Sequence, residues 1–184
     1  MPSEEQYRAL EKRISFLERL ERPQEIEYRI AAQNARKGSS APADANRAVG
    51  ASGGVLVPVI QFSSVTQQDV YFVFHVPVEL DANKKIYFHF MWCASGLWGS
   101  GNYDMKLEYL VKDETGVIAA GAPTTLEFDL TPANNTNFFE TEDATGITVA
   151  PDQMVLCHFY RDVANDNGDG TFDLLFFEFE YWTR

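Results

Sequence analysis

Hydrophobic and polar residues alternate along two adjacent runs near the middle of the chain. These are residues 69–77 (DVYFVFHVP) and 85–94 (KIYFHFMWCA), both rich in aromatic and β-branched side chains. Such residues suit the pleated, half-buried surface of a sheet. The turn-forming residues 81–83 (DAN) lie between the runs. The pattern therefore predicts two neighbouring strands of an antiparallel sheet.

Runs of the same kind continue to the C-terminus, separated by Gly, Asn, Asp and Pro. Further strands are expected at residues 55–62, 103–111, 124–130, 136–140, 146–149, 153–162 and 171–182. Short, regularly spaced strands without a helical period are typical of a sandwich or barrel. We predict a mainly β fold: an antiparallel jelly-roll-like β-sandwich preceded by an N-terminal α-helical segment and a linker.

Alternation assigns side chains to the two faces of each strand. The second strand places Phe72 and Phe74 on one face and Tyr71 and Val73 on the other, so both faces are apolar. A contiguous exposed aromatic patch is uncommon on a monomer. We expect cover from a loop, the N-terminal segment or another subunit. The last strand is expected to divide into two faces, Leu175, Phe177, Phe179 and Tyr181 against Leu174, Phe176, Glu178, Glu180 and Trp182.

Residues 4–22 carry a helical pattern, with Glu4 and Arg8 as a favourable i,i+4 pair. A narrow apolar stripe suggests a short coiled coil, although about two and a half heptads are marginal alone. The alternative is a helix packed on its own body or on another surface. The residues expected to mediate oligomerisation or attachment are Tyr7, Leu10, Ile14, Leu17 and Leu20.

Pro23 fits the first turn of a second, weaker helix over residues 24–36. Residues 38–54 are small and polar, which predicts a flexible linker or an extended arm. Three parts are therefore expected: a helical attachment or oligomerisation segment at 1–37, the linker at 38–54, and the β-sandwich body at 55–184.

Charge is spread unevenly along the 184 residues. The net charge of the chain is −12, and residues 38–184 hold 7 Lys/Arg against 20 Asp/Glu. An acidic body repels phosphate, so we expect no nucleic-acid partner. The first residues lack the apolar run of a signal peptide, and no run reaches the roughly 18 apolar residues of a membrane helix. No membrane partner is expected, and Cys93 and Cys157 are expected to be reduced, buried thiols, with a disulfide between strands as the alternative.

Three patterns in the sequence resemble chemical sites: an Asn/Asp loop, three histidines and a pair of glutamates. Asn165, Asn167 and Asp169, followed by Asp173, imitate the spacing of a calcium loop, but a hairpin turn between two strands explains the same residues. His75, His89 and His158 lie in predicted strands without four converging ligands, which favours core or interface histidines over zinc.

Glu178 and Glu180 share a strand face that we interpret as solvated. We expect no catalytic residues, no metal ligands and no cofactor, and therefore no enzyme. Trp98 and Tyr103 are the candidate ligand rim.

The body resembles β-sandwich structural proteins of tailed-phage virions. The matching pieces are the strand at 69–77 that ends in Val-Pro, the next strand ending in Trp92, and the C-terminal hairpin. That hairpin joins residues 159–162 (FYRD) through an Asp/Asn/Gly turn to residues 171–175 (TFDLL) and a closing Glu-Tyr-Trp. The resemblance is a pattern over about residues 55–184.

The resemblance implies a non-enzymatic virion component, such as a capsid decoration protein, head fibre or tail appendage, commonly trimeric. The expected partners are other copies of the chain, as a homotrimer, and virion proteins such as the major capsid protein, reached through the N-terminal segment. The expected location is the virion, assembled in the host cytoplasm. The alternative function is a carbohydrate- or host-receptor-binding head of a phage appendage.

Overall fold

The structure, a computed structural model, describes residues 4, 7, 8, 11–13, 23–49, 55–94, 101–113, 122–132, 137–168 and 170–183. Apart from helical positions before residue 14, these residues form eleven strands and one short 3-10 helix. In chain order the elements are β1 (Gln24–Ala31), η1 (Ala32–Asn34), β2 (Arg36–Lys37), β3 (Ala43–Val49), β4 (Val55–Phe62), β5 (Asp69–His75), β6 (Tyr87–Ala94), β7 (Tyr103–Asp113), β8 (Thr124–Leu130), β9 (Phe139–Glu142), β10 (Gln153–Arg161) and β11 (Phe172–Thr183).

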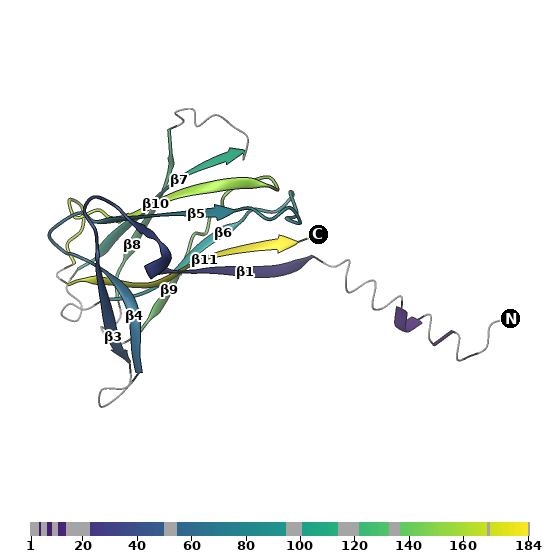
Figure 1. Cartoon of the computed structure of the whole chain (residues 1–184), viewed down its shortest axis with the longest axis horizontal. Coiled ribbons are helices and arrows are strands. Elements are labelled where there is room, and N and C mark those ends of the chain that lie inside the picture. Colours follow the sequence, from purple (N-terminus) through teal and green to yellow (C-terminus); the bar gives the residue numbers. More distant parts are fainter. Residues whose placement is uncertain are drawn as a thin grey trace.

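The strands pair into two antiparallel sheets that form a sandwich (Figure 1). Sheet A has the order β3-β4-β11-β6-β9, and β1 also pairs with β11. Sheet B has the order β2-β5-β10-β7-β8. From β4 to β11, consecutive strands lie in opposite sheets, except for β7 and β8. Most pairings therefore join segments that are distant in the sequence, and the predicted antiparallel β-sandwich is confirmed.

Aromatic rings from both sheets fill the space between them. Phe72 of β5 stacks on Phe177 of β11 with ring centroids 4.2 Å apart, and Phe74 stacks on Phe179 at 4.3 Å. The fully buried Phe88 of β6 contacts both Phe177 and Phe179. Burial of one such side chain contributes about 1.5–3 kcal/mol, and a good ring pair about 0.5–1.5 kcal/mol more. These contacts fix which face of each sheet points outward.

Most strand predictions agree with the structure within a few residues. β4 and β8 have the predicted bounds, whereas β9 begins three residues later than expected. The expected strand at 146–149 is only an isolated bridge between Ile147 and Ile86. A regular alternation over β11 was wrong, because its register against β6 shifts between Leu174 and Phe176. This irregularity places Leu174 in the core and leaves Leu175 half-buried.

Residues 24–31 form a strand, so the predicted second helix at 24–36 was wrong. Ile26 and Ile30 lie four residues apart, which fits a helix, but Tyr28 between them also completes a strand alternation. β1 pairs with β11 over eight residue pairs, and both isoleucines pack against the core. Pairing with a long apolar strand therefore decided the local structure.

Part of the predicted linker is also a strand. Residues 43–49 form β3, which pairs with β4 from Ala43 opposite Gln61 to Val49 opposite Val55. Small, polar residues give this segment little intrinsic strand preference, so its conformation depends on the ladder of hydrogen bonds to β4. The sandwich therefore includes residues before 55.

The first helix is described only at scattered positions. Residues 4, 7, 8 and 11–13 are helical, and the predicted ion pair between Glu4 and Arg8 is present at 3.0 Å. Among the described residues, no helix combines the length and the apolar character needed to span a membrane.

Both cysteines are buried free thiols, as predicted. Burial raises the pKa of Cys93 to about 12, and the nearby Asp173 carboxylate adds to this effect. Burial also raises the pKa of Cys157. Neither side chain is therefore a reactive thiolate at neutral pH.

Strand β3 supplies the cation for a fully buried carboxylate. Arg47 Nη1 lies 3.1 Å from Asp173 Oδ2, and Arg47 Nη2 donates to the Ala94 carbonyl. Gln61 Nε2 donates to the other Asp173 oxygen at 2.9 Å. Burial raises the pKa of Asp173, whereas Gln61, Thr171 and Arg47 oppose that shift. The edge strand is thus tied to the centre of sheet A by a charged contact.

Replacement of Arg47 by alanine is expected to lower the free energy of unfolding by about 2 kcal/mol, because Asp173 then stays buried without its cation. Urea denaturation followed by circular dichroism measures this change. The double variant with Asp173→Asn should recover part of the loss. A stability within about 0.5 kcal/mol of wild type for Arg47→Ala would show that the contact is not structural.

Candidate functional site

The outer face of sheet B carries an aromatic and polar row next to an apolar row. In the strand register, Tyr71 lies opposite both Arg36 of β2 and His158 of β10, and His158 lies opposite Glu108 of β7. Cross-strand partners point to the same face. The next row on this face consists of Val73, Leu156 and Leu110.

The two rows border a hollow of about 620 Å³. Its lining includes Asn34, Arg36, Tyr71, Val73, Glu108, Leu110, Leu156 and His158. A smaller hollow of about 590 Å³, lined by Arg36, Lys37, Gly38, Ser39 and Tyr71, lies on the β2 side. Tyr71 lines both hollows, and 41% of its surface is exposed, so a ligand in either hollow can contact its ring.

Aromatic stacking holds the Tyr71 ring in place. Its centroid lies 4.5 Å from that of the His158 ring, and the two planes differ by only 5°. The His158 ring also stacks on Tyr160, with ring centroids 4.8 Å apart and an angle of 28° between the ring planes. A ring fixed in this way loses little conformational entropy when a ligand contacts it.

Two carboxylates flank the stack. Glu108 accepts a hydrogen bond from Tyr160 Oη at 3.1 Å. It also lies 3.1 Å from His158 Nδ1 and accepts a hydrogen bond from this nitrogen in the tautomer that has its proton there. Asp69 Oδ2 lies 3.3 Å from His158 Nε2. His158 Nε2 makes no hydrogen bond within the described residues, so the contact with Glu108 and the stacked tyrosine rings set the orientation of the imidazole.

These contacts shift the ionisation of both tyrosines. A hydrogen bond to Asp69, together with burial, raises the pKa of Tyr71. Burial and the Glu108 charge raise the pKa of Tyr160 to about 12. Both hydroxyls stay protonated at neutral pH, so the two tyrosine rings are uncharged, and the hollow adds the Arg36 guanidinium and the Glu108 carboxylate.

Such a face can bind a molecule with one apolar side and several hydroxyl groups. Apolar C–H groups can pack on Tyr71 and the Val73 row, while hydroxyls meet Glu108, Arg36 and Asn34 at the margins. The sequence had indicated that Tyr71 and Val73 form a second apolar face. It did not reveal His158, Glu108 or Arg36, since their approach depends on strand order.

Of the two residues predicted from the sequence as a ligand rim, Tyr103 is among the described residues. Tyr103 is only 2% exposed and packs against Trp92 and Phe172, with Arg161 4.7 Å above its ring. It is a core residue, which corrects the prediction. Trp98 lies outside the described residues.

Of the predicted attachment residues, Tyr7 is among the described residues. Tyr7 is 55% exposed on its helical turn, and Leu10, Ile14, Leu17 and Leu20 lie outside the described residues. Their role stays a prediction.

The loop that resembles a calcium site is organised by an arginine. Arg161 is fully buried, forms an ion pair with Asp166 at 2.6 Å, and donates to the carbonyls of Gly168 and Gly170. Asn167 Oδ1 accepts from the Asn102 backbone N–H instead. The described side chains of this loop therefore bind protein groups, as in the hairpin interpretation.

Comparisons with known proteins concern the fold. No model of a known protein family matches the sequence, and no curated protein sequence matches it significantly. The solved structures that are similar include a CBM35 carbohydrate-binding module of Abf62 from Cellvibrio japonicus, with a TM-score of 0.53 and 8% identity over 84% of this chain and 92% of that one.

Two other solved structures are similar to this chain with lower TM-scores. An isomalto-dextranase from Arthrobacter globiformis has a TM-score of 0.48 and 14% identity over 83% of this chain, which spans only 23% of that enzyme. Tailspike protein 4 of bacteriophage CBA120 has a TM-score of 0.40 and 9% identity over 84% of this chain and 19% of that one. At these identities the likeness shows a β-sandwich and no more.

Replacement of Glu108 by alanine is expected to lower the free energy of unfolding by about 1 kcal/mol, because His158 and Tyr160 lose their shared acceptor. Glu127→Ala is the matched control, since this carboxylate of the same sheet is 69% exposed and forms an ion pair with Lys106 at its margin. The control should stay within about 0.5 kcal/mol of wild type. Equal effects of both variants in a thermal melt would contradict the anchoring role of Glu108.

Proposed function

We propose that the chain is a carbohydrate-binding β-sandwich and that it binds saccharide on the outer face of sheet B. The observation that carries the proposal is the Tyr71 ring, 41% exposed, stacked on His158 and bordering the hollow of about 620 Å³. An aromatic ring that is both exposed and fixed is what an apolar sugar face requires.

The chemistry around the ring fits a pyranose. One side of such a sugar presents C–H groups, which can pack against Tyr71 and the neighbouring Val73 and Leu156. Its equatorial hydroxyls then point outward in the plane of the ring, where Glu108 accepts and Arg36 donates hydrogen bonds. Specificity would come from these margins, because buried polar groups left without a partner are costly.

Charge narrows the class of saccharide. The chain from residue 38 onward has 20 acidic and 7 basic residues, and the site itself contains Glu108 and Asp69. Polyanionic glycans would be repelled by this field. We therefore propose neutral oligosaccharides or polysaccharides as the ligands.

The likeness to a carbohydrate-binding module supports the fold on which this proposal stands. At 8% identity it does not transfer a binding site, so the proposal depends on the geometry of the Tyr71 face.

The mounting of this sandwich on a phage particle also stays a proposal. It rests on the sequence resemblance to virion proteins and on the helical pattern before residue 23. In that arrangement the residues before 23 would anchor or trimerise the chain, and the sandwich, which includes β1 and β2, would serve as the carbohydrate-binding head of an appendage, without catalysis.

A glycan array with the full-length chain should give signals for neutral glycans, and Tyr71→Ala should weaken binding of the best ligand at least tenfold in calorimetry, about 1.4 kcal/mol. Tyr28→Ala is the matched control, because Tyr28 is also an exposed strand tyrosine, at 51%, but lies on β1 of sheet A. Its affinity should equal that of wild type. Circular dichroism verifies that each variant is folded.

Trp98→Ala separates this site from the rim predicted from the sequence. Unchanged binding by Trp98→Ala together with loss in Tyr71→Ala supports the sheet B face. Loss of binding in Trp98→Ala with unchanged binding in Tyr71→Ala would overturn the proposed site, and a chain that binds no glycan would overturn the proposed function.

A further inference from the structure

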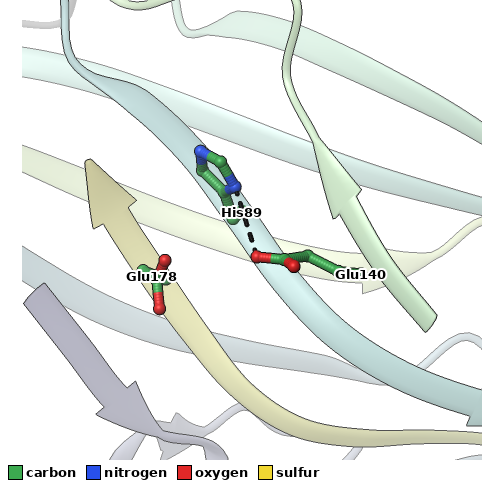
Figure 2. A group of neighbouring side chains, drawn as sticks. All are labelled: His89, Glu140 and Glu178. Atoms are coloured by element: carbon green, nitrogen blue, oxygen red, sulfur yellow. Dashed lines mark ion pairs between the residues drawn. The ribbon is translucent and has the colours of Figure 1, made fainter. Parts of the chain in front are cut away.

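The outer face of sheet A carries a second cluster, unrelated to the Tyr71 face. His89 of β6, Glu178 of β11 and Glu140 of β9 each place one potential ligand atom within 4.8 Å of the other two (Figure 2). Glu178 lies directly opposite His89 in the strand register, and Glu140 lies opposite Met91 on the other side. Three strands that are far apart in the sequence therefore bring these side chains together.

The histidine is buried without a hydrogen-bond partner for one of its nitrogens. His89 is only 7% exposed, and its Nε2 makes no hydrogen bond within the described part of the chain. Glu180 Oε2 lies 3.4 Å from this nitrogen, and Glu140 Oε1 lies 3.6 Å from Nδ1. A buried imidazole nitrogen that points among carboxylates without a hydrogen bond requires an explanation.

Negative charge exceeds positive charge around this imidazole. Glu140, Glu142, Glu178 and Glu180 all lie on the outer face beside His89. Glu178 has a side chain only 3% exposed, and its ion-pair partner is Arg29 of β1. The sequence interpretation of a solvated carboxylate face was thus wrong for Glu178.

One arginine with a side chain 58% exposed does not balance four carboxylates. A divalent cation would offset this excess negative charge.

We propose that His89, Glu140 and Glu178 form a binding site for a first-row divalent metal ion, with Zn²⁺ as the best fit. An imidazole ligand excludes the all-oxygen coordination that Ca²⁺ and Mg²⁺ prefer, and mixed nitrogen and carboxylate ligands suit Zn²⁺. Water completes four ligands, because Glu180 faces Nε2 of the imidazole, whereas Glu140 faces Nδ1. Tetrahedral zinc places its ligand atoms about 3.3 Å apart, so the side chains need to approach by about an ångström.

Two features make that approach feasible. Glu140 has a side chain 52% exposed on β9, a strand of four residues at the edge of sheet A, so its carboxylate can rotate. Arg29 can move away from Glu178, because it also forms an ion pair with Glu27 and lies 5.0 Å from the centre of the Phe176 ring. These two contacts would still hold the guanidinium. The ion would then join β9 to β6 and β11.

Calorimetry with Zn²⁺ and the full-length chain tests the site. We expect one Zn²⁺ per chain and binding at least tenfold weaker in Glu140→Gln and in His89→Gln. Glu25→Gln is the matched control: it removes one charge from the same face but no ligand, and its affinity should stay within twofold of wild type. Arg29→Gln should bind Zn²⁺ more tightly, because the competing cation is removed from Glu178.

The outcome remains informative if the buried His89 variant does not fold. Glu140→Gln changes a half-exposed side chain on an edge strand and should be folded by circular dichroism. Absence of saturable Zn²⁺ binding in wild type, or unchanged affinity in folded Glu140→Gln, would overturn the site. Equal affinity for Ca²⁺ and Zn²⁺ would overturn the role of His89 as a ligand.

Discussion

The stacking of β5 against β11 is the contact on which the rest of the sandwich depends. Phe72 and Phe74 of sheet B meet Phe177 and Phe179 of sheet A at 4.2 and 4.3 Å. Because side chains alternate along a strand, once these rings face inward their neighbours must face outward. Tyr71 is thereby presented on one side of the molecule and Glu178 on the other.

The two outward faces have opposite character, and this difference follows from the partners of each central strand. On sheet B, β10 places His158 beside Tyr71, which gives a row of stacked rings next to aliphatic side chains. On sheet A, β11 is flanked by β1 and β6, which bring Arg29 and His89 to Glu178. The first face suits an uncharged ligand with apolar surface, and the second suits a cation.

The strands of the body could be predicted from the sequence because each contains its own alternation. β4 and β8 were predicted to the residue, since apolar runs bounded by turn residues carry the signal locally. β1 and β3 could not be predicted in this way. Ile26 and Ile30 fit a helix as well as a strand, and β3 consists largely of small and polar residues that become a strand only by pairing with β4.

The candidate site was less predictable than the fold, because it depends on which strands become neighbours. Tyr71 was recognisable as an outward-facing aromatic residue, but its contact with His158 joins residues almost ninety positions apart. Tyr103 was misassigned to the rim for a related reason: the buried Arg161 that covers its ring comes from β10. Local patterns do not encode contacts of this kind.

Chemical-shift mapping of the ¹⁵N-labelled chain, titrated with the best neutral oligosaccharide from the array, tests the central claim most directly. We expect the largest amide shifts at Tyr71, Val73, Leu110, Leu156 and His158, which are neighbours on the outer face of sheet B. Shifts concentrated on β6, β9 and β11 of sheet A, or in the loops at the ends of the sheets, would contradict the claim, as would the absence of any shift.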